Sequence, residues 1–453
     1  MLKVRMRYLW GLAAGAVALA LALQPARAVP SFASQTGQPC TACHAGAFGP
    51  QLTPFGRAFK MTGYTLSGGE GLASRIPLSG MVQTSFTNTA QGQPGGAAPH
   101  FGDNNNFAMD QVSLFLAGRV NDYAGGFIQA TYSSVDQTFL WDNTDLRLTT
   151  PINLPNDANL RLGFSLNNGP TVQDPYNTTY AWGYPFISSS LAPTPTAGPI
   201  IASLIGNSIG TTVSAWYDNA LYVEAGVYNT MSTPLSKMLG QFGGPGSSTA
   251  PMPYARIAYE WDWAGQAAEI GGLLFHASLE PGGTPGFGSD TYTDFAVDGT
   301  YQLIGDGTNV VTVNGIYTHE IQHLSSSVAQ GIAANANGYL DFINANVSYY
   351  YQHTYGVTFG VQSTTGSADA LLYAPGPVGG SLTGSPNSMA FITELDWVPF
   401  GKSDSVGAPF ANLKFGLQYT AYTEFNGGTS NYDGFGRSAS ANNTLYAFAW
   451  LAF

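Results

Sequence analysis

Near its C-terminus the chain reads Asn412-Leu413-Lys414-Phe415-Gly416-Leu417-Gln418-Tyr419-Thr420-Ala421. Leucine, phenylalanine, tyrosine and alanine fill the odd positions of this stretch, whereas Lys414, Gln418 and Thr420 stand at even positions. Because successive side chains of a β-strand point to opposite faces, the alternation predicts a strand with one apolar and one polar face. Such a strand fits a barrel wall that has lipid outside and a polar lumen inside.

Strand-like segments of this kind recur from Arg75 to the end of the chain and are separated by turn residues. We therefore expect an all-β fold: an antiparallel outer-membrane β-barrel of about 16 strands, preceded by a small N-terminal segment. An even strand number is typical of single-chain bacterial barrels. The expected strands span 75–88, 107–120, 124–135, 138–149, 158–167, 209–218, 220–230, 253–263, 266–278, 291–304, 308–321, 338–352, 355–365, 388–399, 411–424 and 442–453.

The connections between these strands are expected to alternate in length. Short turns such as Asp218-Asn219 and Gly265-Gln266 alternate with long linkers, of which residues 168–208 form the longest. Outer-membrane barrels have short periplasmic turns and long external loops. This asymmetry places the N-terminal segment on the periplasmic side. The connection between 124–135 and 138–149 is the exception, because it is short where a long external loop is expected.

Composition favours a membrane barrel over a soluble sheet protein. Charged residues make up 9% of the chain, whereas about 25% is usual in soluble domains. Beyond the N-terminal region no stretch is apolar for long enough to form a transmembrane helix. A soluble β-sandwich also alternates, but it rarely combines so few charges with Trp and Tyr at so many strand ends. The final strand ends in Phe453, and an aromatic end is typical of outer-membrane barrels.

Residues 1–28 have the organisation of a secretory signal peptide. Basic residues precede an apolar run from Leu9 to Leu23, and Ala26-Arg27-Ala28 is a cleavage site of the A-x-A type. An uncleaved membrane anchor is the alternative, but the apolar run is short for a span. Cleavage removes four basic residues and turns the formal charge of −12 into about −16, which argues against a nucleic-acid partner.

The pentapeptide Cys40-Thr41-Ala42-Cys43-His44 follows soon after the expected cleavage site. C-x-x-C-H indicates covalent attachment of one haem c, because two thiols at this spacing reach both vinyl groups of the ring. The adjacent His44 then becomes the proximal ligand of the haem iron. A zinc half-site is the alternative, but the chain has only two cysteines and so no second pair to complete it. If both cysteines carry haem, none is left for a disulfide.

The mature chain is expected to have two parts. Residues 29–72 hold the haem motif, and a segment of about 40 residues rarely builds a core of its own. We expect this segment to plug the barrel lumen and to bury itself against the haem, the lumen wall, or both. Residues 73–453 then form the transmembrane barrel, with outer-membrane lipid around it.

Three stretches carry a resemblance to a known family. Residues 30–37 read PSFASQTG, residues 52–64 read LTPFGRAFKMTGY, and residues 162–175 read LGFSLNNGPTVQDP. They resemble the fused monohaem cytochrome–porins of iron-oxidising bacteria. The resemblance implies an iron oxidase that takes electrons from extracellular Fe(II) and passes them to a periplasmic cytochrome or copper protein. One departure is Ser34, where the family is expected to have arginine, and it weakens any propionate contact there.

Other haem contacts are candidates only. Met61 is the nearest candidate for the distal ligand, and methionine in that position raises the reduction potential. It is equally readable as a packing residue, and His100, Met109 and Met81 are more remote options. Arg57 and Lys60 could form charge-assisted bonds to the haem propionates, or they could contact carboxylates of the lumen.

Two further patterns have weaker interpretations. His319-Glu320-Ile321-Gln322-His323 matches H-E-x-x-H, a zinc motif that requires a helix. Here it ends an expected strand, which would separate the two histidines by about 13 Å. Oxygen-rich tips in the loops, residues 103–106, Asp290, Asp369 and Asp433, could attract Fe²⁺ or could simply be solvated surface.

The sequence leaves several functions open. Electron transfer from extracellular Fe(II) through one haem is the first. The second is a porin whose haem-bearing plug acts in sensing, or in electron export to an extracellular acceptor. The sequence does not distinguish the two directions of electron flow, because direction depends on the reduction potential. A soluble periplasmic haem enzyme is disfavoured by the barrel pattern.

Overall fold

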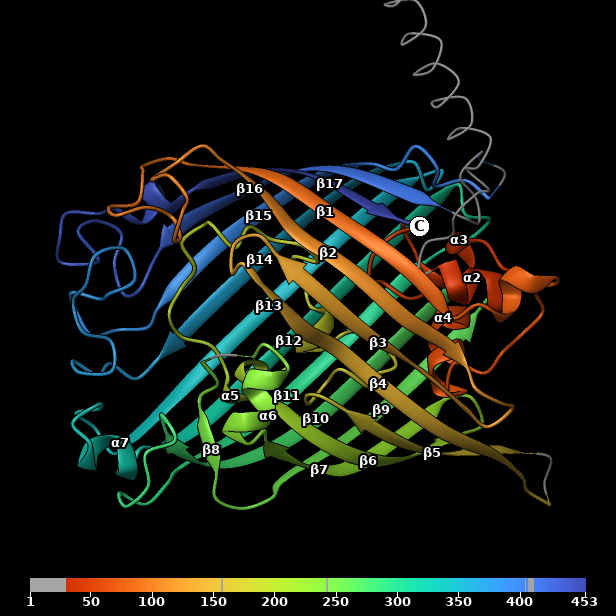
Figure 1. Ribbon diagram of the computed structural model, residues 1–453, viewed down its shortest axis with the longest axis horizontal. Helices are drawn as coiled ribbons and strands as arrows, with labels where there is room; N and C mark the ends of the chain where they lie inside the picture. Colours follow the sequence, from red (N-terminus) through yellow and green to blue (C-terminus); the bar gives the residue numbers. More distant parts are fainter. Residues whose placement is uncertain (1–29, 156–157, 242, 404, 406–410) are drawn as a thin grey trace, which may run out of the picture.

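The computed structural model describes residues 30–453, apart from 156–157, 242, 404 and 406–410. The expected signal peptide, residues 1–28, therefore lies outside the described residues. In the described part a single antiparallel sheet curls into a closed barrel (Figure 1). Closure is made by β17, which pairs with β1 so that Ala452 stands opposite Met81. No helix in this part of the chain is long and apolar enough to cross a bilayer.

Sixteen strands make up the wall, and each pairs with the next wall strand along the chain. Their bounds are β1 (Leu78–Thr89), β2 (Asn106–Arg119), β3 (Ala124–Ser133), β4 (Thr138–Asn153), β5 (Asn159–Asn167), β6 (Ser208–Tyr217), β7 (Leu221–Thr230), β9 (Met252–Trp263), β10 (Gln266–Pro281), β11 (Asp290–Leu303), β12 (Asn309–His323), β13 (Asn337–Tyr351), β14 (Tyr355–Gly366), β15 (Ser388–Trp397), β16 (Asn412–Glu424) and β17 (Thr444–Ala452). All sixteen predicted strands are present. The unpredicted β8 (Gly246–Ser248) pairs with the end of β10 beyond β9, so it adds no position to the wall.

The alternation in the sequence becomes an inside and an outside. In β16 the outward side chains Phe415 and Leu417 are exposed, whereas the inward Lys414 and Gln418 are buried. Every backbone group of a closed sheet finds a partner in a neighbouring strand, so the wall can stand in lipid without unsatisfied amides. The fold therefore has a lipid-compatible outer face and a polar interior, as the pattern predicted.

The two ends of the barrel differ as expected. At one end the strands are joined by tight turns, and Asp218 and Asn219 both adopt the positive φ angles that a two-residue turn requires. At the other end lie the long loops, including short helices α6 (Thr233–Met238), α7 (Ser325–Ala329) and η3 (Ala439–Asn442). Figure 1 shows the turns and the C-terminus at the right, opposite the long loops. The β3–β4 connection, residues 134–137, is short even though it lies at the long-loop end.

The N-terminal segment lies at the turn end of the barrel (Figure 1). It contains α2 (Pro30–Thr36), α3 (Cys40–Cys43), α4 (Pro54–Met61) and η1 (Leu72–Arg75). We call residues 30–75 the plug, because its side chains contact inward-facing residues of the wall. Thr53 caps α4 by accepting a hydrogen bond from the amide of Gly56, and Pro54 starts the helix without needing a donor.

A second segment also fills the lumen. Residues 168–207 connect β5 to β6 and fold inward instead of standing outside, with η2 (Tyr180–Trp182) and α5 (Ile200–Ser203) along their path. We call them the inward loop. Gln418 of β16 donates to the carbonyl of Ile187, and Tyr180 hydrogen-bonds to Thr318 of β12. A cavity of about 290 Å³ remains toward the long-loop end, lined in part by Pro193, Tyr422 and Tyr446.

Candidate functional site

The C-x-x-C-H motif forms one helical turn and its exit. Cys40 to Cys43 make up α3, and the amide of His44 donates to the carbonyl of Cys40 at 2.9 Å. Both thiols are half-buried and free of any disulfide. Burial, and then the nearby Cys40, raise the pKa of Cys43 to about 12. The two sulfur atoms are therefore protonated thiols on the same turn, which is the arrangement that the motif requires.

The residues after the motif explain why this turn forms. The amide of Thr53 donates to the carbonyl of Cys43 at 2.9 Å, and the Thr53 hydroxyl donates to the carbonyl of Ala42. Gly56 lies so close to the Cys43 carbonyl that a Cβ atom would overlap it. The stretch that contains Thr53, Pro54 and Gly56 is thus a support for the motif, and Gly56 is required there by close approach.

His44 has the properties of a neutral metal ligand. Its Nδ1 atom is buried and has no hydrogen-bond partner. Burial lowers the pKa of His44 to about 4, against a smaller opposing effect of a backbone contact with Gly49. The imidazole is therefore neutral near pH 7 and keeps the lone pair that a metal ligand needs. Two free thiols on one turn and a neutral, unsatisfied imidazole fit a covalently attached haem.

Other wall residues surround the motif. Ala45 is fully buried against Val310 and Tyr350, and its carbonyl lies 3.0 Å from Nδ1 of His353. Asn412 donates to the carbonyl of Ala47 at 2.7 Å. His353 lies in the turn between β13 and β14, and no pattern in the sequence singled it out. Within the described residues no three His, Cys, Asp or Glu side chains gather as a metal-ion cluster, and a haem with one imidazole ligand does not require such a cluster.

Met61 lies at the end of α4 in an apolar cluster. Its buried side chain packs with Tyr176, Tyr222 and Ala258, which belong to the inward loop, β7 and β9. The motif instead packs toward β12, β13 and β16. These apolar neighbours agree with the interpretation of Met61 as a packing residue. They do not test ligation of the haem iron, so the role of Met61 as distal ligand stays a prediction. Of the more remote options, Met81 is buried in another apolar cluster, Met109 is exposed on an outward face, and His100 is exposed in the β1–β2 connection.

Arg57 pairs with the wall. Its Nη2 atom lies 2.6 Å from Oε1 of Glu260 in β9, and its Nη1 atom donates to Oε1 of Gln302 in β11 at 2.8 Å. The guanidinium is fully buried. A contact with a lumen carboxylate was one of the two alternatives for Arg57, and it is the one that the described residues form. A propionate contact stays a prediction.

Lys60 bonds to the inward loop. Its ammonium donates to the carbonyls of Val172 and Asp174 at 3.1 and 2.6 Å, and to Oδ1 of Asn177 at 2.9 Å. The same ammonium lies 4.6 Å from the ring centre of Trp182. Burial, and then the neighbouring Arg147, lower the pKa of Lys60 to about 7. Lys60 therefore joins the plug to the inward loop, and its propionate contact also stays a prediction.

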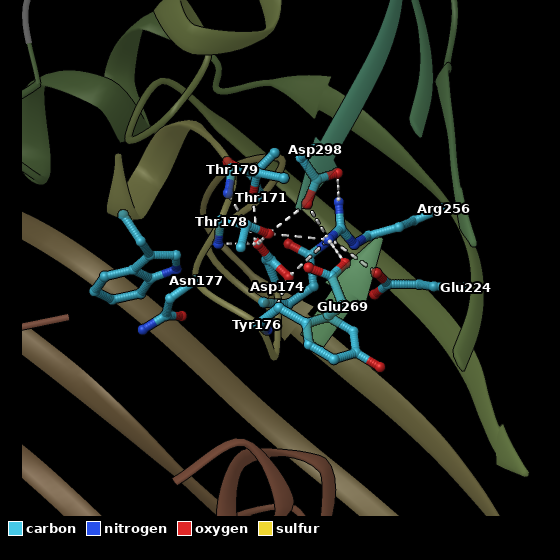
Figure 2. Close-up of polar contacts among 12 residues, drawn as sticks. Thr171, Asp174, Tyr176, Asn177, Thr178, Thr179, Glu224, Arg256, Glu269 and Asp298 are labelled. Carbon is cyan, nitrogen blue, oxygen red and sulfur yellow. Dashed lines mark hydrogen bonds and ion pairs between the residues drawn. The ribbon is translucent and has the colours of Figure 1, made fainter. Parts of the chain in front are cut away.

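A buried ion cluster fixes the first part of the inward loop (Figure 2). Figure 2 shows Arg256 of β9 among the carboxylates of Asp298, Glu269 and Asp174. Asp174 in turn accepts hydrogen bonds from the amides of Tyr176, Thr178 and Thr179. Burial alone would raise the pKa of Asp174, but Arg256 and Lys60 hold it below its usual range. The sequence analysis did not predict this cluster, because its members come from four segments that lie apart along the chain.

The H-E-x-x-H stretch lies in β12, as predicted. His319 and His323 are on the outer face of the strand, and Glu320 is on the lumen face with 1% exposure. The helix on which a zinc site of this type depends is not formed.

Three acidic residues that were expected to be solvated loop surface have a different environment in the structure. Asp290, Asp369 and Asp433 are each buried, so they are not solvated surface. Asp290 accepts from the amides of Ser326 and Ser327, and Asp369 accepts from those of Ala334 and Asn335. Their carboxylates are occupied by backbone donors and stabilise the folds of the long loops.

Comparisons with protein-family models and with curated proteins find no match. Among solved structures the chain is similar to OmpT of Vibrio cholerae, with 10% identity, a TM-score of 0.43, and coverage of 83% of this chain and 96% of that one. It is also similar to the channel DcaP of Acinetobacter baumannii, with 11% identity, a TM-score of 0.45, and coverage of 83% and 96%. An anion-selective porin from Comamonas acidovorans has 13% identity, a TM-score of 0.45, and coverage of 83% and 98%.

The strand pairing itself defines the class. A closed antiparallel barrel of sixteen wall strands, with an apolar outer face and a polar lumen, is the architecture of porins in the bacterial outer membrane. The chain is therefore a porin-like outer-membrane β-barrel. Its lumen differs from an open channel, because the plug and the inward loop occupy it.

Proposed function

We propose that this barrel is an outer-membrane electron-transfer protein with one haem c attached at Cys40 and Cys43. Its electron donor is extracellular Fe(II), and its acceptor is a periplasmic cytochrome or copper protein. The observation that carries the proposal is the position of the motif: it lies in the plug at the turn end of a barrel whose opposite end carries long loops and a cavity. On this proposal the haem attachment site lies toward one side of the membrane, and the cavity lies toward the other.

Each residue of the motif has a defined part. The thiols of Cys40 and Cys43 would hold the ring, and the neutral imidazole of His44 would bind its iron. The haem, when bound, supplies a centre that gains and loses one electron. Fe(II) gives up one electron and becomes Fe(III), so no bond or proton has to move in the protein. This chemistry needs no general acid or base.

The packed lumen supports electron transfer over solute diffusion. Arg57, Lys60 and the Arg256 cluster join the plug, the inward loop and the wall through buried charged contacts. A free diffusion channel would need that space to be open. Export of electrons to an extracellular acceptor uses the same arrangement in reverse, and only the reduction potential decides between the two directions.

Stopped-flow absorbance tests the proposal directly. Oxidised full-length protein in detergent is mixed with Fe(II) at acidic and at neutral pH, and the bands of a reduced c-type haem are followed. Their rapid appearance is the expected result. A haem that stays oxidised with Fe(II) and is reduced by dithionite would contradict Fe(II) as donor and favour export or sensing. A Cys40→Ala/Cys43→Ala variant, which has no covalent haem, gives the baseline.

A further inference from the structure

Two carboxyl groups stand directly opposite each other on the lumen face of the wall. Asp294 of β11 and Glu320 of β12 are register partners in the sheet, and their exposures are 0% and 1%. Their side chains lie within hydrogen-bonding distance of each other. Like charges at directly opposed positions destabilise a sheet, and burial adds the cost of removing both from water.

Both carboxyl groups hold the second part of the inward loop. The amide of Ile200 donates to Oε2 of Glu320 at 2.5 Å, and the amide of Ile201 donates to Oδ2 of Asp294 at 3.1 Å. These amides begin α5, and Ile200, Ile201 and Leu204 are buried in an apolar cluster with residues of β7, β9 and β10. The carboxyl pair therefore supports the polar end of a segment whose side chains fill the lumen.

No cation balances the pair within the described residues. Gln322 donates to Oε1 of Glu320 at 2.6 Å, and Oδ1 of Asp294 is buried without any donor. No ion pair of the described part includes Asp294 or Glu320. The titratable groups nearest to them are the phenols of Tyr180, Tyr292 and Tyr373. Asp290 and Asp298 share the lumen face of β11 with Asp294. Asp290 is occupied by Ser326 and Ser327, and Asp298 is bound by Arg256.

Two buried carboxylates in contact without a cation cannot both stay charged, and such pairs share one proton. We propose that Asp294 and Glu320 form a proton-binding site that holds α5 and the inward loop in the lumen. The proton belongs on Oδ1 of Asp294, which then donates to Glu320. When it is lost, repulsion and the hydration of the second charge separate the pair from α5, and the inward loop leaves the wall there.

The two parts of the inward loop can be compared with each other. Its first part is held by Asp174, whose negative charge is balanced by Arg256. Its second part is held by a pair that requires a proton. The first part should therefore stay in place over a wide pH range, while the second part is retained in acid and released toward neutral pH. This inference concerns the apoprotein and the haem-loaded protein alike, and it does not rest on the electron-transfer proposal.

Hydrogen exchange of the full-length protein in detergent tests the site. Protection factors, corrected for the intrinsic pH dependence of exchange, are measured for residues 200–204 and for residues 176–179. Between about pH 4 and about pH 8 we expect protection of 200–204 to fall about tenfold or more, and that of 176–179 to stay constant. Asp294→Asn keeps an oxygen for Ile201 and a donor for Glu320, so it should hold 200–204 protected at both pH values.

Control variants and a second measurement decide the outcome. Glu320→Gln should behave as Asp294→Asn does, so the test can still be made with one of these variants if the other fails to fold. Asp290→Asn, at a buried carboxylate of the same strand, should keep the full pH dependence of residues 200–204. Bilayer conductance should rise toward neutral pH in the wild type and stay low in Asp294→Asn. Equal protection of 200–204 at both pH values in the wild type, or an unchanged pH dependence in Asp294→Asn and Glu320→Gln, would overturn the proposal.

Discussion

Arg57 of the plug and Glu260 of β9 form a buried ion pair, with Nη2 and Oε1 2.6 Å apart. The same guanidinium donates to the carbonyl of Leu52, which follows the haem motif in the plug. One side chain thus connects the wall, the plug helix and the segment that supports Cys43. Its removal should disturb the position of the motif as well as the stability of the plug.

Replacing Arg57 by methionine should destabilise the plug by about 3–5 kcal/mol, because it leaves the charge of Glu260 buried without a partner. The free energy of opening, measured by native-state hydrogen exchange of α4, checks this value. The double variant Arg57→Met/Glu260→Gln should recover most of the loss. Arg119→Met is the matched control: Arg119 pairs with the exposed Asp122, so its loss should cost about 1 kcal/mol or less. Equal effects of the two single variants would contradict the role of burial.

The haem prediction rests on two thiols. Cys40→Ala/Cys43→Ala should yield a folded barrel whose mass shows no covalent haem, because both side chains are half-buried and neither cross-links the chain. Intact-mass spectrometry and the heat-modifiable mobility of the barrel are the two measurements. Ser34→Ala serves as a control, since this buried residue precedes the motif and has no thiol. A wild-type chain without added mass, produced in a host with c-type maturation, would remove the basis of the proposed function.

Met61→Leu separates ligation from packing. The side chain lies among Tyr176, Tyr222 and Ala258, and a change from methionine to leucine at nearly constant volume usually costs less than about 1.5 kcal/mol. We expect the haem absorption spectrum and the reduction potential to stay as in the wild type. Loss of the spectral signature of a methionine–iron bond would show that Met61 is the distal ligand after all.

The buried Lys60 should make stability depend on pH. Burial first, and then Arg147, lower its pKa to about 7, so between about pH 7 and pH 10 the unfolded chain keeps a proton that the folded chain has released. Stability therefore rises with pH across this window, and the burial penalty is fully present below about pH 7. Lys60→Gln should remove this part of the slope in chemical denaturation. If the slope is present in the haem-free Cys40→Ala/Cys43→Ala protein but absent with haem bound, a propionate pairs with Lys60.

The sequence predicted the wall because its signal is local. In β16 and β9 the alternation of apolar and polar residues can be read without knowing any other strand, and turn residues mark where each strand ends. The haem motif is equally local. The bonds that Arg57 and Lys60 make are not local in the sequence, because Glu260 and Asp174 lie more than a hundred residues away along the chain.

The lumen contacts depend on strand register and on one loop's path. Asp294 and Glu320 face each other only because β11 and β12 pair in that register. The inward loop looked like an ordinary external connection, because its length alone does not tell whether it folds in or out. The buried caps Asp290, Asp369 and Asp433 show the same difficulty: an acidic residue in a loop is read as solvated until its backbone donors are known.

Removing Arg256 should change how the inward loop responds to pH. In the wild type its guanidinium contacts Asp298, Glu269 and Asp174. Together with Lys60 it holds the pKa of Asp174 low, so this carboxylate stays charged while buried. Arg256→Met leaves three buried carboxylates without this cation, a change of the kind that costs about 3–5 kcal/mol. The chain can avoid much of that cost by binding protons, which is easier in acid.

The expected result for Arg256→Met is protection of the amides of Tyr176, Thr178 and Thr179 at about pH 4 and its loss at about pH 8. Those amides donate to Asp174, so they report directly on whether its carboxyl group stays in place. Arg256→Lys keeps a charge and should retain protection at both pH values, although with fewer hydrogen bonds. Equal loss of protection at both pH values in Arg256→Met would mean that the packing and hydrogen bonds of the guanidinium, and not its charge, hold this part of the loop.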